Sequence, residues 1–244
     1  QQLRGVLFPF SCIDEQIASG YNRLLQTSQE GGVQSKEFRA IHLADRVRNV
    51  SQVWMGATLG CAQCHDHKYD PLSAEDFYSL GAFFADIDDE AHMRDSETVE
   101  LNSLPTPRPP EIEALGYYQR EHLAQLDAKI EALSDSAEKE RLEELKQERD
   151  QLAAAKSLTM ISQSSEPREV RLLPRGNWLD ETGQVVYPSV TTVFDEHADD
   201  DSERLSRLDL ANWLTDPDTG GGFTARVMVN RFWYLLFGNG IARV

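Results

Sequence analysis

The stretch GCAQCHDHKYDP, at residues 60–71, places two cysteines and two histidines within seven positions. The rest of the 244-residue chain contains one other cysteine and four other histidines. Cys61, Cys64 and His65 form the pattern C-x-x-C-H, the attachment signature of c-type haem. In that chemistry two thiols reach the two vinyl groups of one porphyrin, and the adjacent imidazole binds the iron. At this cysteine and histidine content, chance produces the pattern in about one such sequence in a thousand.

Three other chemistries use cysteines at this spacing. Cys61, Cys64 and a histidine suit zinc, with Cys12 or His42 completing the site, although zinc ligands usually come from two separated knuckles. A thioredoxin-type redox pair follows a strand, whereas a helical pattern precedes Cys61. The third alternative is a structural disulfide or a buried pair of thiols. We therefore predict haem c as the cofactor, with zinc or a disulfide as the alternative.

The haem prediction assigns a role to further residues. His65 becomes an axial ligand of the iron, and the second axial position takes a methionine, a histidine or no residue. Four residues elsewhere in the chain are candidates for that position, namely Met55, His42, His92 and Met93.

The residues after His65 exceed what haem attachment requires. His67 is too close in sequence to reach the opposite face of the same ring. We therefore expect His67, with Asp66 or Asp70, to orient the axial ligand without binding the iron. In the alternative interpretation the two aspartates cap the local turn before Pro71.

Apolar periodicity predicts a mainly α-helical protein. Residues 1–60 look helical, with a period near 3.6 through residues 41–54. After the cysteine motif, Ser73 and Asp76 have the spacing of a capping box and predict the start of the next helix.

The sequence pattern changes from helical to β-type after residue 169. Short β-type runs at 170–173 and 185–187 surround the turn signal DETG and predict a small β-hairpin near 169–190. Helical periods return at 204–214 and 223–238. Thr224 is a candidate cap of the last helix, and Gly238 is a candidate end.

The middle of the chain predicts a linker and a helical hairpin. SLPTPRPPE has four prolines in nine residues, which predicts an extended linker over 91–110. Residues 111–156 are rich in Glu, Lys and Leu, and their apolar positions first step by three and four, as in a coiled coil. This phase breaks at SDSAE, residues 134–138, so we favour an antiparallel hairpin over one continuous rod.

Composition excludes several classes of protein. The chain has 24 basic and 41 acidic residues, a net charge of −17, and no basic stripe, so nucleic acid is excluded as a partner. No apolar run approaches the roughly 18 residues of a membrane span. Three cysteines are too few for a disulfide-rich scaffold. The chain starts at Gln1 without a signal-peptide pattern, and we interpret it as an internal piece of a longer protein.

Two further polar clusters stand out. RGNWLD, at residues 175–180, combines residue types that are common in carbohydrate-binding loops and also in ordinary turns. Arg226 and Asn230 share a helix face and suit a polar network or a binding edge. The sequence contains no G-x-S-x-G, H-E-x-x-H or phosphate-binding glycine loop, so it identifies no enzymatic activity.

Two blocks carry a family resemblance. CAQCHDHKYDP and FTARVMVNRFWYLLFG resemble the planctomycete-type cytochrome-associated surface proteins, which carry two consecutive domains of unknown function. Cys61, Cys64, His65 and the following H-K-x-D-P match the family pattern. Cys12 departs from it, as does the glycine run at 220–222, where the family usually has a short Asn-Pro-Leu segment.

The resemblance implies a domain organisation. Residues 1–90 would be the C-terminal part of a cytochrome-like domain, and 91–110 with 111–156 a variable spacer. Residues 157–244 would hold the β-hairpin and the start of the second domain. Members are exported or surface-located, and often carry a cytochrome c domain upstream.

The sequence thus predicts an exported c-type haem protein that transfers electrons in the periplasm or at the cell surface. Its redox partner and oligomeric state are not encoded in any recognisable pattern. The alternative function is an extracellular polysaccharide-binding or hydrolytic module with a structural zinc or disulfide at the cysteine motif.

Overall fold

Helices dominate the computed structural model, which describes residues 12–25, 34–89, 110–133, 139–191 and 204–242. Within these residues the strands form two separate antiparallel sheets of two strands each. The predicted mainly α class is therefore confirmed. Most of the predicted linker, with His92 and Met93, lies outside the described residues.

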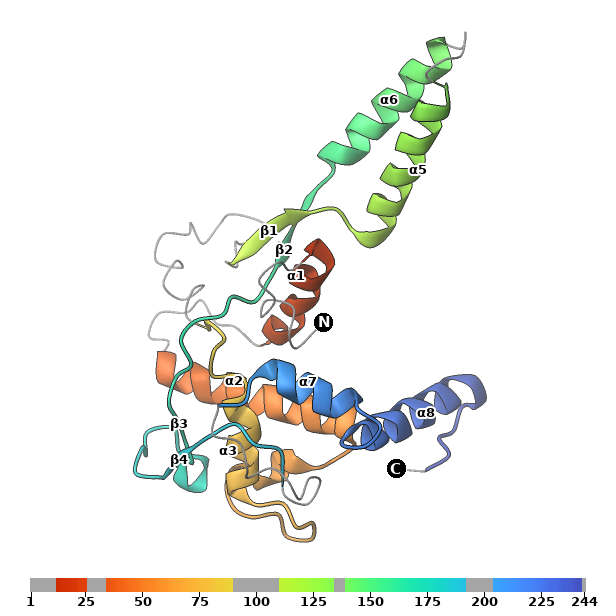
Figure 1. The fold of residues 1–244 in the computed structure, drawn as a ribbon. Coiled ribbons are helices and arrows are strands. Elements are labelled where there is room, and N and C mark those ends of the chain that lie inside the picture. The colour runs from red at the N-terminus through yellow and green to blue at the C-terminus, as the bar shows by residue number, and fades with distance from the viewer. Residues whose placement is uncertain (1–11, 26–33, 90–109, 134–138, 192–203, 243–244) are drawn as a thin grey trace.

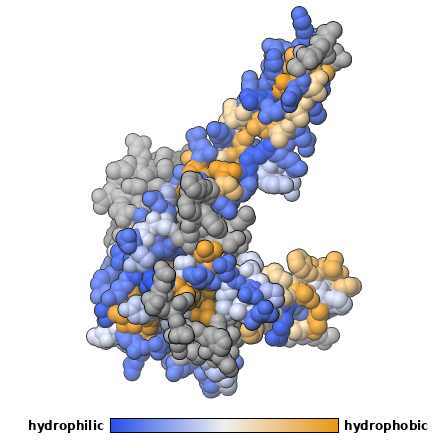
Figure 2. Space-filling model, viewed as in Figure 1, coloured by the Kyte–Doolittle hydropathy of each residue, from blue (hydrophilic) through white to orange (hydrophobic). Residues whose placement is uncertain are grey.

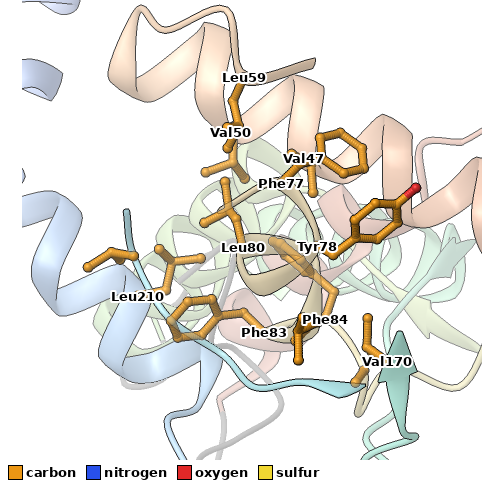
Figure 3. Close-up of a cluster of buried hydrophobic side chains, with 14 of the residues drawn as sticks. Val47, Val50, Leu59, Phe77, Tyr78, Leu80, Phe83, Phe84, Val170 and Leu210 are labelled. Atoms are coloured by element: carbon orange, nitrogen blue, oxygen red, sulfur yellow. The ribbon is translucent and has the colours of Figure 1, made fainter. Parts of the chain in front are cut away.

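The core forms between two helices that flank the cysteine motif (Figure 1). Helix α2, Ser35–Val50, continues into one π-helical turn, Ser51–Met55, which ends at Gly56 in the left-handed conformation. Helix α3, Ala74–Ala82, begins with the predicted capping box of Ser73 and Asp76. Figure 3 shows buried apolar side chains from these helices and their neighbours packed together, among them Val47, Val50, Leu59, Phe77, Leu80, Phe84, Val170 and Leu210.

The predicted small hairpin packs against α3. Strands β3, Val170–Arg171, and β4, Val185–Val186, pair antiparallel, which confirms the expectation for residues 169–190. Between them lies a short 3-10 turn, Pro174–Gly176. Asp180 accepts hydrogen bonds from the backbone N–H and the hydroxyl of Thr182, so DETG forms a turn as predicted.

Helices α7 and α8 are the last two elements of the described chain. Helix α7, Arg207–Thr215, joins the core through Arg207, whose fully buried side chain contacts Asp86 at 2.6 Å. Helix α8, Gly221–Phe237, ends at Gly238 in the left-handed conformation, as predicted. Thr224 was the wrong cap, because the helix begins one turn earlier, in the glycine run. Figure 2 shows the projecting α8 as a largely apolar surface.

The helical hairpin extends away from this core (Figure 1). Helices α5, Tyr117–Leu133, and α6, Lys139–Ala154, pack side by side, which confirms the hairpin prediction. The helical assignment of residues 111–114 was wrong, because strands β1, Glu111–Ala114, and β2, Ser157–Met160, pair antiparallel at the base of the hairpin.

A short helix lies at the start of the described chain. Helix α1, Ile13–Ser19, leads into a 3-10 turn, Gly20–Arg23, and the Arg23 guanidinium donates to the backbone carbonyls of Pro110 and Ile161 beside the β1–β2 pair. Across the described segments, every helix is too short or too polar to cross a membrane.

Candidate functional site

The cysteine motif forms a short 3-10 turn, Leu59–Gln63, whose C-cap is Cys64. Leu59 and Ala62 are completely buried and anchor the turn in the core, whereas Cys61 and Cys64 are exposed. Because a 3-10 helix has three residues per turn, side chains at i and i+3 lie above one another. The burial pattern and the spacing together present both thiols on the outer side of one turn.

The next residue, His65, is exposed with a defined tautomer. Its Nδ1 lies 2.7 Å from the backbone carbonyl oxygen of Asp66. A carbonyl oxygen only accepts hydrogen bonds, so Nδ1 carries a proton and donates it. In the neutral ring Nε2 then has a free lone pair. Metal-binding histidines use this arrangement, with one ring nitrogen donating to a carbonyl and the other binding the metal.

His67 has the opposite tautomer. Its Nδ1 accepts the backbone N–H of Tyr69 at 3.2 Å and that of Asp70 at 2.8 Å, so this nitrogen carries no proton. The Nε2–H then donates to the Thr58 hydroxyl at 3.2 Å, and that hydroxyl donates to Asp70 at 2.8 Å. Both ring nitrogens of His67 are therefore used within its own loop.

Asp66 holds the same loop to α3. The Asp66 carboxylate accepts the backbone N–H of Ala74, in the first turn of α3, at 2.9 Å. The backbone N–H of His67 donates to the carbonyl of Leu72 at 2.8 Å. Asp66 thus contacts the start of α3, beyond Pro71, and Asp70 accepts from Thr58, so the capping of the turn before Pro71 stays a prediction. An orienting role toward a bound group stays a prediction.

Two residues outside the motif position the thiol turn, and no pattern in the sequence pointed to either of them. The buried Tyr78 hydroxyl donates to the carbonyl of Gln63 at 3.0 Å. Burial, together with the nearby Cys64, raises the pKa of Tyr78 to about 12. Gly176 adopts a φ of +70°, and a Cβ atom there would lie 2.9 Å from the Cys64 sulfur. The β3–β4 hairpin thus packs directly against one of the two thiols.

The candidate second axial ligands occupy different surroundings. Met55 is buried and lines a cleft of about 800 Å³ together with Asp70 and residues of α8. His42 is buried on α2, with its Nδ1 3.7 Å from Asp89. His92 and Met93 lie outside the described residues. The structure therefore brings Met55, but not the other candidates, to a described cavity next to the motif.

A buried ion cluster surrounds Asp89. Arg46 donates to both of its carboxylate oxygens, at 2.5 and 2.8 Å, and Arg168 donates at 3.2 Å. Burial disfavours the charged form of Asp89. The charge and hydrogen bonds of Arg46, with a contribution from His42, outweigh this effect and lower the pKa of Asp89. The cluster ties α2 to the segment after α3 and leaves His42 engaged there.

The donor set suits a c-type haem. Cys61 and Cys64 are free thiols, and His65 has an available Nε2. None of these three residues lines the cavities of about 500 and 800 Å³, so the described chain presents the attachment residues at its surface. In the described ranges the three cysteines are free thiols, and no group of three or more metal-binding side chains is assembled.

Comparisons with known proteins place two family matches on the chain. Residues 1–89 match the family PSCyt2, described as a protein of unknown function (DUF1549). Residues 206–244 match the family PSD1, described as a protein of unknown function (DUF1553). We found no similar curated protein and no similar solved structure.

The fold and the two matches define a class: a mainly helical protein with a cytochrome-type C-x-x-C-H turn, since the name PSCyt2 implies a cytochrome-like domain. The chain carries a PSCyt2 match at its N-terminal end followed by a PSD1 match at its C-terminal end, the order found in planctomycete-type cytochrome and surface domains. The resemblance inferred from the two sequence blocks is thereby confirmed.

Proposed function

We propose that Cys61 and Cys64 attach a c-type haem and that His65 binds its iron. Each thiol adds its S–H across one vinyl double bond, so no atom is lost and no oxidant is required. The observation that carries this proposal is the paired geometry of the turn: two exposed thiols at i and i+3, followed by an imidazole whose Nε2 is available.

The surroundings of the turn supply rigidity for this role. Tyr78 holds the carbonyl of Gln63 from the core side, and His67 closes the loop that follows His65. A ligand held in one orientation loses less conformational entropy when it binds. Bound haem supplies a one-electron iron couple, and the protein residues orient it and control its access to solvent.

The proposed role is electron transfer outside the cytoplasm. Haem c is attached after export, so this cofactor implies that the protein is located in the periplasm or at the cell surface. The attachment residues lie at the surface of the described chain, where a redox partner can approach them. No particular redox partner is indicated.

Expression in a host with a haem c assembly pathway tests the proposal. The wild-type protein should retain haem through denaturing electrophoresis and give a pyridine haemochrome of the c type. The Cys61→Ala, Cys64→Ala double variant should lose covalent haem. Cys12→Ala is the matched control, because Cys12 is also an exposed free thiol but lies outside the C-x-x-C-H motif. It should retain full haem content.

A further variant tests the role of His65. His65→Ala leaves both thiols in place, so covalent attachment should persist while the visible spectrum changes with the loss of an axial ligand. A colourless wild-type protein from a competent host, or one with stoichiometric zinc, contradicts the proposal. An unchanged haem content in the double-cysteine variant contradicts it equally.

A further inference from the structure

A cavity of about 500 Å³ lies between α2, α3 and the β3 segment, next to the cysteine turn. Its volume falls within the range of small-molecule binding sites. Gln63 is the residue of the cysteine turn that lines it, and Cys61, Cys64 and His65 do not. The cavity is therefore a second site, distinct from the proposed haem attachment.

Positive charge is concentrated along this cavity. The lining contains five cationic side chains and three carboxylates, whereas the whole chain carries a net charge of −17. A local excess of cations in a strongly acidic protein attracts small anions and raises their local concentration. The cations are Lys36, Arg39, Arg46, Arg168 and Arg171.

The contacts of the carboxylates explain the excess. Buried Asp89 is shared between Arg46 and Arg168, so one negative charge faces two guanidinium groups. The other two carboxylates each contact one cation: Glu181 lies 2.8 Å from Lys36, and Glu169 lies 2.6 Å from Arg171. The formal charges of the lining residues therefore add up to +2.

Arg39 is half-buried in this environment. Burial lowers its pKa, and the charge of Arg168 lowers it further, against the opposing effects of Asp89 and Glu181. An oxyanion in the cavity would offset both unfavourable effects. Arginine is well suited to this contact, because its planar guanidinium donates two parallel hydrogen bonds to a carboxylate or sulfate.

The cavity also has an aromatic wall. Trp178, from the RGNWLD stretch at residues 175–180, lines it together with Phe77 and Tyr78. The Trp178 turn is held by the Asn177 side chain, which accepts the backbone N–H of Leu179 at 3.1 Å. An indole face next to guanidinium groups suits a ligand that has both a ring with an apolar face and an anionic substituent.

We propose that this cavity binds the carboxylate- or sulfate-bearing ring of an acidic sugar. Arg39 contacts the oxyanion, and the Trp178 ring packs against the face of the sugar. The proposal is independent of haem, because the residues involved take no part in haem attachment.

Calorimetric titration of the full chain tests it with four probes: glucuronate, glucose 6-sulfate, glucose and inorganic sulfate. At least one of the two charged sugars should bind at least about tenfold more tightly than glucose. Glucose lacks the oxyanion, and about tenfold in affinity is the difference expected for one charge-assisted contact. The same sugar should bind more tightly than inorganic sulfate, because the ring contributes contacts with Trp178. The better of the two charged sugars identifies the oxyanion.

Variants assign the contacts. Arg39→Gln should weaken binding of the charged sugar about tenfold and leave glucose unaffected, and Arg39→Lys should weaken it less. Trp178→Ala should weaken binding of the charged sugar and not that of sulfate. Arg141→Gln, an exposed arginine on α6, is the matched control and should change nothing. Thermal melting of each variant verifies that it is folded.

Any one of the following results overturns the proposal. The first is the absence of measurable binding for both charged sugars. The second is equal affinity for glucose and the charged sugars, or an unchanged affinity in folded Arg39→Gln. The third is inorganic sulfate binding as tightly as the sugars, which would show a simple anion site. None of these results alters the haem proposal, whose test measures covalent attachment.

Discussion

The Nδ1 atom of His67 accepts the backbone N–H of Asp70 at 2.8 Å, and this contact defines which nitrogen of the ring carries the proton. The Nε2–H then completes a chain through Thr58 back to the Asp70 carboxylate. The residues that follow the C-x-x-C-H pattern therefore build a closed loop. That loop connects the thiol turn to the first turn of α3.

Replacing His67 by alanine should destabilise the protein by about 1–3 kcal/mol, because two backbone N–H groups lose their acceptor. Urea unfolding at pH 7 measures the change. His122→Ala is the control, since His122 is about half exposed on the helical hairpin and should cost little. Equal effects of the two substitutions would show that the His67 loop adds no stability.

Gly176→Ala should restrict access to Cys64. The added Cβ would lie 2.9 Å from the Cys64 sulfur, and the φ of +70° costs a non-glycine residue about 1–2 kcal/mol. We expect slower alkylation of Cys64 relative to Cys61, measured by mass spectrometry of the haem-free protein. Gly222→Ala provides the control, because a Cβ at Gly222 has no neighbour within 4 Å. An unchanged ratio of the two alkylation rates would contradict the described packing.

Asp89→Asn should cost about 3–5 kcal/mol at pH 7, since it leaves the buried Arg46 without a carboxylate. The pKa of Asp89 is lower in the folded state than in the unfolded state. Its stabilisation is therefore complete above the unfolded pKa of about 4 and declines as the pH falls below it.

Urea midpoints measured from pH 7 down to pH 3 test this linkage. The gap between the wild-type protein and Asp89→Asn should narrow below about pH 4. Asp218→Asn, at an exposed position in the turn before α8, should follow the wild-type curve throughout. A gap that is constant over this range would mean that Asp89 titrates alike in both states.

Tyr78→Phe should remove the hydrogen bond to Gln63 and cost about 0.5–1.5 kcal/mol at neutral pH. The pKa of Tyr78 is raised to about 12 in the folded state, compared with about 10 in an unfolded chain. The stabilisation is therefore present below pH 10 and is lost as the pH rises toward 12. Unfolding midpoints between pH 8 and 11 should show the wild-type protein losing its advantage. Tyr118→Phe, at an exposed position, should show no such change.

Local signals in the sequence were sufficient for much of the fold. Ser73 and Asp76 specify the start of α3 because a capping box forms between residues three positions apart. Gly238 specifies the end of α8 because the left-handed conformation favours glycine. The phase break at 134–138 predicted two helices, since a shift of the apolar stripe cannot be buried on one continuous face.

No local signal in the sequence predicted the strand pairings between distant residues. Strands β1 and β2 are four residues each, and their pairing joins Ala114 to Ser157 across the whole helical hairpin. A strand this short is specified by its partner more than by its own composition. The start of α8 was misplaced because the glycine run at 220–222 has weak intrinsic helix propensity. A side chain at Gly220 or Gly221 would meet Trp213 or Asp216, a close approach that the sequence alone does not reveal.

The sequence by itself determined the chemistry of the site: two thiols and an imidazole at the spacing of haem attachment, in a chain with the two family blocks. Only the tertiary structure decided what surrounds that chemistry. It placed Gly176 against Cys64, shared Asp89 between two arginines, and brought Trp178 to a cationic cavity. The physical reason is that covalent spacing defines which groups are adjacent in the chain. Burial, charge and hydrogen-bond partners depend on segments that only folding brings together.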